Sequence, residues 1–243
     1  MRVLVAAFAF NEIKYIADWV RYYSGQGCEL LVVDNYSTDG TYEWCGKHGV
    51  HTGRVDTNDA FNLLILQRSL TDHIHKLKPD WVVYSGIDLY QIFPGGIRDV
   101  ISKAEAGGHN IIEVDHFEAF NTGEEVKVPL TMNHFYTRQH GRLRMIAKPT
   151  DGFKLIADNI IVTNPSVYHS DGVLINYGMC KPREEREVTF ARRKRAWELG
   201  MHKGWGIHYV PAKKTDWVWE KKTLWDIRKN QRVYELIKQT WNE

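Results

Sequence analysis

Cysteine is scarce in this chain, and its spacing fits neither a metal site nor a disulfide framework. The three cysteines, Cys28, Cys45 and Cys180, lie far apart in the sequence. Zinc motifs place their cysteine and histidine ligands a few residues apart, and small secreted scaffolds carry an even number of cysteines. We therefore expect reduced thiols and a cytoplasmic location.

Long hydrophobic runs are also lacking. The apolar opening stretch MRVLVAAFAF ends abruptly at Asn11 and Glu12, with no small-residue cleavage site after it. A membrane-spanning helix needs about 20 apolar residues, and a secretory signal needs a cleavage site. The stretch therefore predicts a buried strand over residues 3–8, and no transmembrane segment is expected.

Neither sign of charge is in excess. Lysine and arginine number 32 against 30 aspartates and glutamates, a net charge of +2, so the overall charge does not favour nucleic acid or an anionic membrane as partner. A local basic run over residues 192–195 falls on a predicted helix, where consecutive residues point in different directions. We expect a solvated helix surface there. A nucleic-acid partner, with stacking by the tryptophan-rich tail, is the minority alternative.

What the chain does contain is an alternation of apolar strands and amphipathic helices within 243 residues. Strands are predicted over 3–8 and 30–33, on either side of a helix that starts near Ile13 with Asn11 as its N-cap. Such β-α-β units form a parallel sheet in a single α/β domain, and ligands bind at the carboxyl ends of the strands. The later predicted elements are helices over 63–77, 97–106, 182–199 and 224–241 and strands over 81–84 and 110–114.

Polar residues follow two of these strands at the carboxyl edge of the sheet. In LLVVDNYSTDG, Asp34, Asn35 and Asp39 come after the second strand, and Asp88 lies beyond the strand WVVY. Two independent strands are thus expected to bring acids to one edge. The alternative for the first segment is a solvated turn, because Asx and Ser side chains bond their own backbone and Gly40 permits positive φ.

The segments FNEIKYIADWVRYYSGQG, VVDNYSTDGT and DWVVYSGIDLYQIF resemble the family 2 glycosyltransferases with the GT-A fold. The resemblance covers the first half of the chain well and the second half loosely. It implies a Rossmann-like α/β domain, with a mixed but mainly parallel sheet flanked by helices and with helical segments at the C-terminus. Residues 1–115 would form the nucleotide-sugar-binding half of this single domain, and residues 116–243 the acceptor half.

The resemblance also implies a nucleotide pocket, with a UDP-sugar as the favoured donor. The residues at the family's pocket positions are Phe8, Asn11, Glu12, Asp34, Asn35 and Asp39. A looser likeness over INYGMCKPREEREVTFARRKRAWE, in which Asn176 stands where histidine is usual, assigns Lys181 and Arg183 to the diphosphate.

A divalent ion, Mn²⁺ or Mg²⁺, is the implied cofactor, but its motif is incomplete. Where family members carry Asp-x-Asp, this chain has Gly86-Ile87-Asp88, so the first acid is missing. An ion held chiefly by diphosphate and water needs few protein oxygens. Asp88 is therefore expected to keep the site, with His169 as a second ligand and His208 as the runner-up. The alternative is that Asp88 only caps a following helix.

The implied reaction moves a sugar, in hexosyltransferase-like chemistry, from the nucleotide to a hydroxyl of a glycan, lipid-linked or other acceptor. A base must take the acceptor proton, and in inverting family members an acid beyond the metal strand does so. The candidates are Asp115, Glu118 and Asp171. Asp115 is preferred because it follows the predicted strand over 110–114; an N-cap or an ion pair is its alternative. The alternative functions are a non-catalytic nucleotide-sugar-binding protein, a transferase acting on modified DNA bases and a nucleic-acid-binding module.

Overall fold

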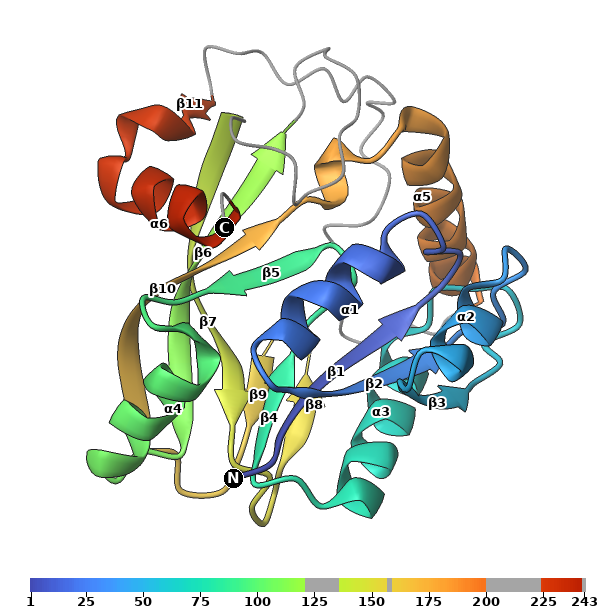
Figure 1. The fold of residues 1–243 in the computed structure, drawn as a ribbon. Coiled ribbons are helices and arrows are strands. Elements are labelled where there is room, and N and C mark those ends of the chain that lie inside the picture. The colour runs from blue at the N-terminus through green and yellow to red at the C-terminus, as the bar shows by residue number, and fades with distance from the viewer. Residues whose placement is uncertain (121–135, 157–158, 200–223, 242–243) are drawn as a thin grey trace.

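Helices cover a central sheet in this protein (Figure 1). The structure is a computed structural model that describes residues 1–120, 136–156, 159–199 and 224–241. The first half of the chain forms β1 (Val3–Ala9), α1 (Ile16–Gly25), β2 (Glu29–Asp34), α2 (Thr41–Lys47), β3 (His51–Arg54), α3 (Leu63–Leu77), β4 (Trp81–Tyr84), β5 (Leu89–Ile92) and α4 (Gly96–Ala106). The second half forms β6 (Ile111–Phe120), β7 (Tyr136–Ala147), β8 (Lys154–Ile156), β9 (Asn159–Ile161), β10 (Val167–Asn176), the 3₁₀ turn η2 (Gly178–Cys180), α5 (Arg183–Glu198), β11 (Trp225–Asp226), the 3₁₀ turn η5 (Ile227–Lys229) and α6 (Gln231–Trp241).

The strand order of the main sheet is β3-β2-β1-β4-β7-β6-β10-β5, with β11 paired to β7. The first four strands in this order are parallel to one another, and β6 and β10 are parallel as well. All pairs that involve β5, β7 or β11 are antiparallel. The expected α/β class, with a mixed but mainly parallel sheet flanked by helices, is therefore confirmed.

Helix α3 agrees with its predicted bounds, because its start and stop signals are local. Leu66, Leu70 and Ile74 lie on the buried face, as the spacing of apolar residues predicts. The side chain of Asn62 accepts a hydrogen bond from the backbone N–H of Ile65 (3.2 Å) and caps the first turn. Lys78 ends the helix in the left-handed conformation, just before a proline.

Helix α1 begins later than the sequence predicts, and Asn11 is not its N-cap. Asn11 has a φ of 54°, and the helix starts only at Ile16. The cause is a tie between two loops, since the Asn11 N–H donates to Ser37 Oγ (2.8 Å) and the Thr38 N–H donates to Asn11 Oδ1 (2.8 Å). Residues between β1 and α1 therefore follow the neighbouring loop instead of continuing the helix.

The short strand β5 was not predicted. It lies at the edge of the sheet, although the strand before it in the chain, β4, lies in the middle. It follows β4 after a four-residue turn, Ser85 to Asp88, yet it pairs with β10, three strands further along the sheet. Leu89 lies opposite Asn176 in that pair. The turn that carries Asp88 therefore meets the end of β10.

Strand β6 is also longer than predicted, because pairing on both edges carries it to Phe120.

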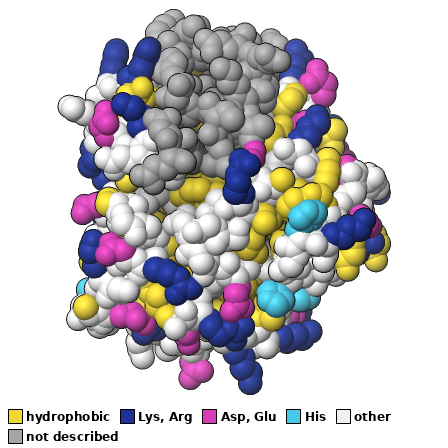
Figure 2. All heavy atoms as spheres, viewed as in Figure 1, with side chains coloured by type: hydrophobic (Ala, Val, Ile, Leu, Met, Phe, Trp, Pro, Cys, Tyr) yellow, Lys and Arg dark blue, Asp and Glu magenta, His cyan; other side chains and the backbone are white. Residues whose placement is uncertain are grey.

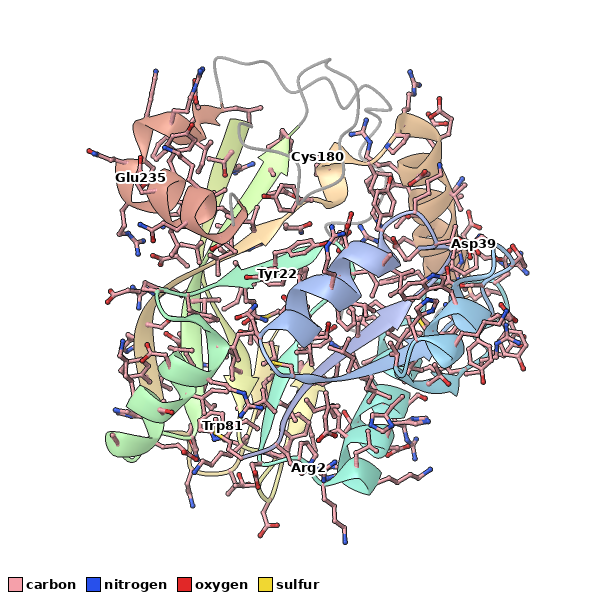
Figure 3. All side chains as sticks on the ribbon, viewed as in Figure 1. Arg2, Tyr22, Asp39, Trp81, Cys180 and Glu235 are labelled. Carbon is pink, nitrogen blue, oxygen red and sulfur yellow. The ribbon has the colours of Figure 1, made fainter. Side chains whose placement is uncertain are left out.

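A second, smaller core lies between β5, β10 and α6. Ile92, Ile175 and Ile237 are buried there. Tyr22 of α1, labelled in Figure 3, donates from its hydroxyl to the carbonyl of Gln91 in β5 (2.9 Å). The last helix is shorter than predicted, since residues 225–229 form β11 and η5 instead. Among the helices of the described ranges, none has both the length and the apolarity that a bilayer span requires.

Candidate functional site

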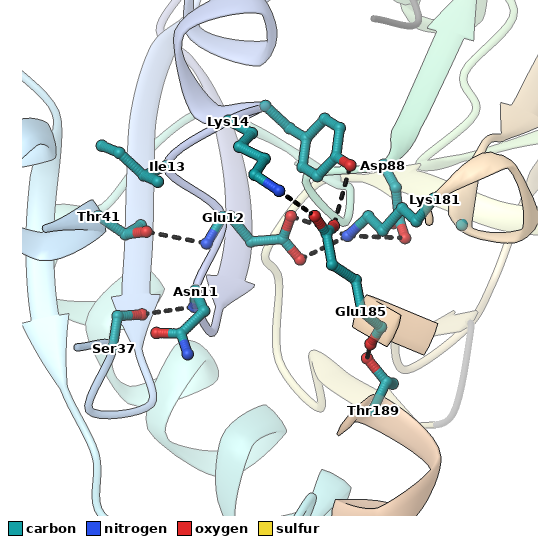
Figure 4. A network of polar contacts seen from close by, with 12 residues as sticks. Asn11, Glu12, Ile13, Lys14, Ser37, Thr41, Asp88, Lys181, Glu185 and Thr189 are labelled. Carbon is teal, nitrogen blue, oxygen red and sulfur yellow. Dashed lines mark hydrogen bonds and ion pairs between the residues drawn. The ribbon is translucent and has the colours of Figure 1, made fainter. Parts of the chain in front are cut away.

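The loops after β1 and β2 are held together at the carboxyl edge of the sheet by Asp39. Its Oδ2 accepts the N–H of Ile13 (3.0 Å), and its Oδ1 accepts the N–H of Thr41 (3.0 Å) at the start of α2. Thr41 in turn accepts the N–H of Glu12 on its hydroxyl oxygen (2.9 Å; Figure 4). Both carboxylate oxygens of Asp39, one of the expected pocket residues, thus accept hydrogen bonds from the backbone of these loops. These contacts fix the backbone that presents Glu12.

Asp34, at the end of β2, is fully buried and only half satisfied. Its Oδ2 accepts the N–H of Ser37 (2.9 Å) and lies 3.4 Å from Nε of Arg54. Its Oδ1 is buried and has no hydrogen-bond partner among the described residues. Buried carboxylate oxygens nearly always have a donor. The second oxygen of Asp34 is therefore a candidate acceptor for a ligand N–H or hydroxyl.

Arg192 of α5 lies against the aromatic end of β1. Its guanidinium carbon is 3.3 Å from the ring centroid of Phe10. With the Asn35 amide turned so that both ends are satisfied, Asn35 donates to the carbonyl of Val55 (3.0 Å) and accepts from Arg192 (2.6 Å). Phe8, the expected pocket residue, packs edge-on against Phe61 (5.8 Å between centroids). The sequence prediction did not include Phe10 or Arg192, because no local pattern pairs α5 with β1.

The basic run on α5 is correspondingly not a uniformly solvated surface, and that expectation was wrong. Arg192 is 6% exposed, and Arg193 lies over the ring of Phe61 (5.1 Å). Only Lys194 and Arg195 of the run face solvent, and the face seen in Figure 2 mixes Lys and Arg with Asp and Glu side chains. Since half of the run points inward, it does not form a continuous basic stripe.

Three charged side chains from distant segments, Glu12, Asp88 and Lys181, meet at the carboxyl edge of the sheet (Figure 4). The Lys181 ammonium donates to both oxygens of Glu12 (2.6 and 2.8 Å) and lies 3.6 Å from Oδ2 of Asp88. Glu185 of α5 accepts from Lys14 (2.6 Å) and from the hydroxyl of Tyr15 (2.9 Å). Glu12 and Lys181, two expected site residues, are thus partners of each other, and Asp88 shares the same cation.

Burial and the charges of neighbouring side chains together shift the pKa values in this cluster. Burial raises the pKa of Glu12 to about 7, although the charge of Lys181 opposes the shift. Burial by itself lowers the pKa of Lys181, but the negative charges of Glu12 and Asp88 outweigh it, so the net shift is upward. Burial, followed by the hydrogen bond to Glu185, also raises the pKa of Tyr15. Lys181 is therefore a cation at every physiological pH.

Asp88 does not cap a helix. It lies in the turn before β5, and helix α4 has Gly95 as its N-cap. The Asp88 carbonyl accepts the N–H of Tyr177 (2.8 Å), and a Cβ placed on Gly178 would be 2.8 Å from Asp88 Oδ2 and 3.1 Å from Asn176 Oδ1. The carboxylate therefore needs the glycine of η2 beside it.

The described side chains do not fit the expected divalent ion as they stand. The position between the carboxylates of Glu12 and Asp88 is taken by the Lys181 ammonium. His169 is seven residues before Asn176 along β10, roughly 20 Å from Asp88 at about 3.3 Å per residue, and its Nδ1 pairs with Glu113 (3.0 Å). Within the described ranges, no three His, Cys, Asp or Glu side chains are grouped as metal ligands. His208 lies outside the described residues.

The three candidate bases differ in how far they are engaged. Asp115 lies within β6, not at its end, and accepts from Arg142 (3.1 Å) and from Arg232 (3.1 Å), which was its alternative role. Asp171 is exposed and offers its carbonyl to Arg232 (2.7 Å). Glu118 bonds Nε2 of His140 (3.0 Å). Of the three, Glu118 lies nearest to η2, because it is opposite Asn176 in the pair of β6 with β10.

Arg183, assigned to the diphosphate by the sequence, points along its own helix. It is exposed at the start of α5 and donates to Glu187 one turn later (2.7 Å). Lys181, two residues earlier, is instead drawn inward by Glu12. The turn η2, which joins β10 to α5, explains the difference, because it directs Lys181 but not Arg183 toward the rim of the sheet.

Comparison with protein-family models finds no match for the chain, nor does comparison with curated protein sequences. Among solved structures, S. aureus TarS 1–349 with UDP-GlcNAc is similar at 17% identity over 54% of this chain and 38% of that chain, with a TM-score of 0.41. The same protein with UDP aligns at 12% identity over 99% and 88%, with a TM-score of 0.45. Glucosyl-3-phosphoglycerate synthase from Mycobacterium tuberculosis, with Mn²⁺ and UDP, aligns at 18% identity over 47% and 44%, with a TM-score of 0.34. This chain thus spans less than half of the first and third of these proteins, and we base its function on its own residues.

Proposed function

We propose that this protein is a GT-A glycosyltransferase, which moves a sugar from a nucleoside diphosphate to an acceptor hydroxyl. One observation carries the proposal: a buried, half-satisfied carboxylate and a fixed cation lie beyond the ends of β2 and β4, the two strands that flank β1. Asp34 offers an unpartnered oxygen at the end of β2, and Lys181 is held beyond β4 by Glu12 and Asp88. The carboxylate oxygen can accept hydrogen bonds from a nucleoside, and the ammonium can bind the negative charge of a diphosphate. The motifs after β1 and β2 support the same reading.

In this proposal the nucleoside lies over β1 and β2. The free oxygen of Asp34 accepts from the base or the ribose, and the ring of Phe10 offers an apolar face for the base in exchange for the guanidinium of Arg192. The diphosphate then points toward Lys181. UDP-sugars are the first donors to test, and an inverting outcome with a glycan or lipid-linked acceptor belongs to the proposal.

Glu118 is the base that the geometry favours. It is opposite Asn176, which is opposite Leu89, the residue after Asp88. Two strand spacings, about 10 Å, therefore separate its backbone from the turn that carries Asp88. Asp115 is engaged by two arginines, so removing a proton would require it to leave both ion pairs. The bond between His140 and Glu118 orients the carboxylate of Glu118.

The direct test is binding followed by turnover. Titration calorimetry with UDP and GDP measures whether a nucleoside diphosphate binds, and NMR of UDP-sugars with the protein measures hydrolysis or transfer. We expect micromolar binding of one nucleotide and slow hydrolysis of its sugar in the absence of an acceptor. Binding without any turnover across acceptors would favour the non-catalytic binding protein, and no binding of either nucleotide would refute the proposal.

A further inference from the structure

Lys181 occupies the place where a free cation would otherwise sit. Its ammonium lies between the carboxylates of Glu12 and Asp88, at hydrogen-bond distance from the first and at ion-pair distance from the second. Its side chain is only 14% exposed. The ring of Tyr15 covers it on one side, with the ring centroid 5.0 Å away. Because two carboxylates and an aromatic ring surround the ammonium, its charge has a fixed position in the site.

The hydrogen bonds of this ammonium leave one donor over. A lysine ammonium has three N–H donors, and two hydrogen bonds go to Glu12. Asp88 Oδ2, at 3.6 Å, is beyond hydrogen-bond distance, so the third N–H has no acceptor within that distance among the described residues. An anionic oxygen at the rim would complete the set. Phosphate oxygens are strong acceptors of this kind.

We propose that Lys181 is the resident cation for the donor's diphosphate, and that sugar transfer by this protein needs no divalent metal. The inference rests on the proposed function and deepens it. Asp88 and Glu12 act through Lys181 as positioning residues: Glu12 fixes two of its donors, and Asp88 draws the ammonium toward the rim. The missing acid at Gly86 then has a physical reason, because the single positive charge of Lys181 is already balanced by Glu12 and Asp88.

The group transfer balances without a metal. The bond between the anomeric carbon and the β-phosphate oxygen breaks, and its electron pair stays on that oxygen as the nucleoside diphosphate leaves. The acceptor oxygen forms the new bond to the anomeric carbon, and its proton goes to the base, for which Glu118 is proposed. Lys181 keeps its own proton and stabilises the leaving diphosphate as a charge.

The test compares metal dependence with lysine dependence, using UDP binding and sugar transfer as separate measurements. We expect the full chain in EDTA to bind UDP and to turn over a UDP-sugar within about twofold of its values with Mn²⁺. Lys181→Met should raise the Kd of UDP at least tenfold and lower transfer by about a hundredfold, as loss of one preorganised electrostatic group does. The exposed Lys194→Met on α5 serves as the matched control and should change neither.

A second variant keeps the test independent of folding. Lys181→Met leaves Glu12 buried without its partner, which destabilises the fold, so the double variant Glu12→Gln, Lys181→Met removes both charges and should fold while transfer stays low. Binding or transfer that EDTA abolishes and Mn²⁺ restores overturns the inference alone and leaves the glycosyltransferase standing. Unchanged transfer in Lys181→Met overturns it as well. Absence of binding of both UDP and GDP under all conditions removes both proposals.

Discussion

At the scale of single residues, the position of the Asp88 carboxylate depends on the absence of a side chain at Gly178. A Cβ at that residue would be 2.8 Å from Asp88 Oδ2, which is too close. The atom in the way is the end of a side chain, so Gly178→Ala should displace the carboxylate at a cost to stability of about 1 kcal/mol or less. We expect transfer to fall roughly tenfold while the melting temperature hardly moves.

The matched control is Gly46→Ala in α2, whose Cβ would meet no atom within 4 Å. It should leave transfer unchanged, and alanine should favour the helix slightly. Steady-state kinetics and thermal unfolding of both variants check the prediction. A Gly178→Ala protein with full transfer rate would mean that the carboxylate of Asp88 does not need its present position.

The second prediction at this scale concerns the unpartnered oxygen of Asp34. Asp34→Asn keeps an acceptor for the Ser37 N–H but removes the charge. We expect the Kd of UDP to rise by a factor of about ten, because a hydrogen bond to a charged group contributes roughly 1.5–3 kcal/mol. Calorimetry on this variant and on Asp72→Asn, an exposed position of α3, makes the comparison. Equal affinities of the two variants would count against a nucleoside contact at Asp34.

The sequence predicted that the acids after β2 and β4 share one edge of the sheet, as they do, but it did not predict their partners. Acids after β2 and β4 are visible as polar residues behind apolar runs, and that signal is local. The tie of Asp39 to Ile13, the contact of Arg192 with Phe10 and the pairing of Lys181 with Glu12 join segments far apart in the chain. No periodicity or spacing encodes these contacts, so only the folded chain reveals which acids are already engaged.

At the scale of elements, the sequence predicted long helices and fully buried strands well, and short edge elements badly. Helix α3 and strand β4 carry their own periodicity and stop signals, so their predicted bounds agree with the structure. Strand β5 has four residues and exists only because β10 pairs with it. Strand β6 extends beyond its prediction for the same reason. Tertiary pairing, which a single sequence does not display, sets these boundaries.

Strand β6 also carries a titration that should make the fold less stable in acid. Burial, aided by the neighbouring charge of His140, lowers the pKa of His116 from 6.5 to about 4. Between these values the unfolded chain binds a proton at His116 that the folded protein does not bind. The contribution of His116 to the free energy of unfolding should therefore fall as the pH drops from about 6.5 to 4, by at most about 3 kcal/mol.

Denaturant unfolding at pH 7 and pH 5 measures this loss. His116→Leu removes the titrating group and should lose less free energy of unfolding on acidification than the wild type does, whereas His48→Gln, at an exposed position before β3, should behave as the wild type does. If the wild type and His116→Leu lost the same free energy on acidification, His116 would not be the group responsible.

At the scale of the whole molecule, the three thiols report on how tightly the fold is closed. Cys28, Cys45 and Cys180 are all buried, and burial raises their pKa values to about 11, 12 and 12. The thiolate is the reactive form, so at pH 8 the native protein should react with DTNB at least a hundredfold more slowly than the chain in guanidinium chloride. A rapid stoichiometric phase in the native state would reveal an opening near one of them.

The distance along the chain between Glu12 and Lys181 has a consequence for biosynthesis. The two residues are 169 positions apart, and a ribosome adds about 5–20 residues per second, so Glu12 is made on the order of ten seconds before its cation exists. Strand β5 likewise waits for β10, its partner among the described strands. The nascent first half therefore carries an unpaired strand edge and ordinary solvated acids, and the site becomes a site only when the last third of the chain has been synthesised.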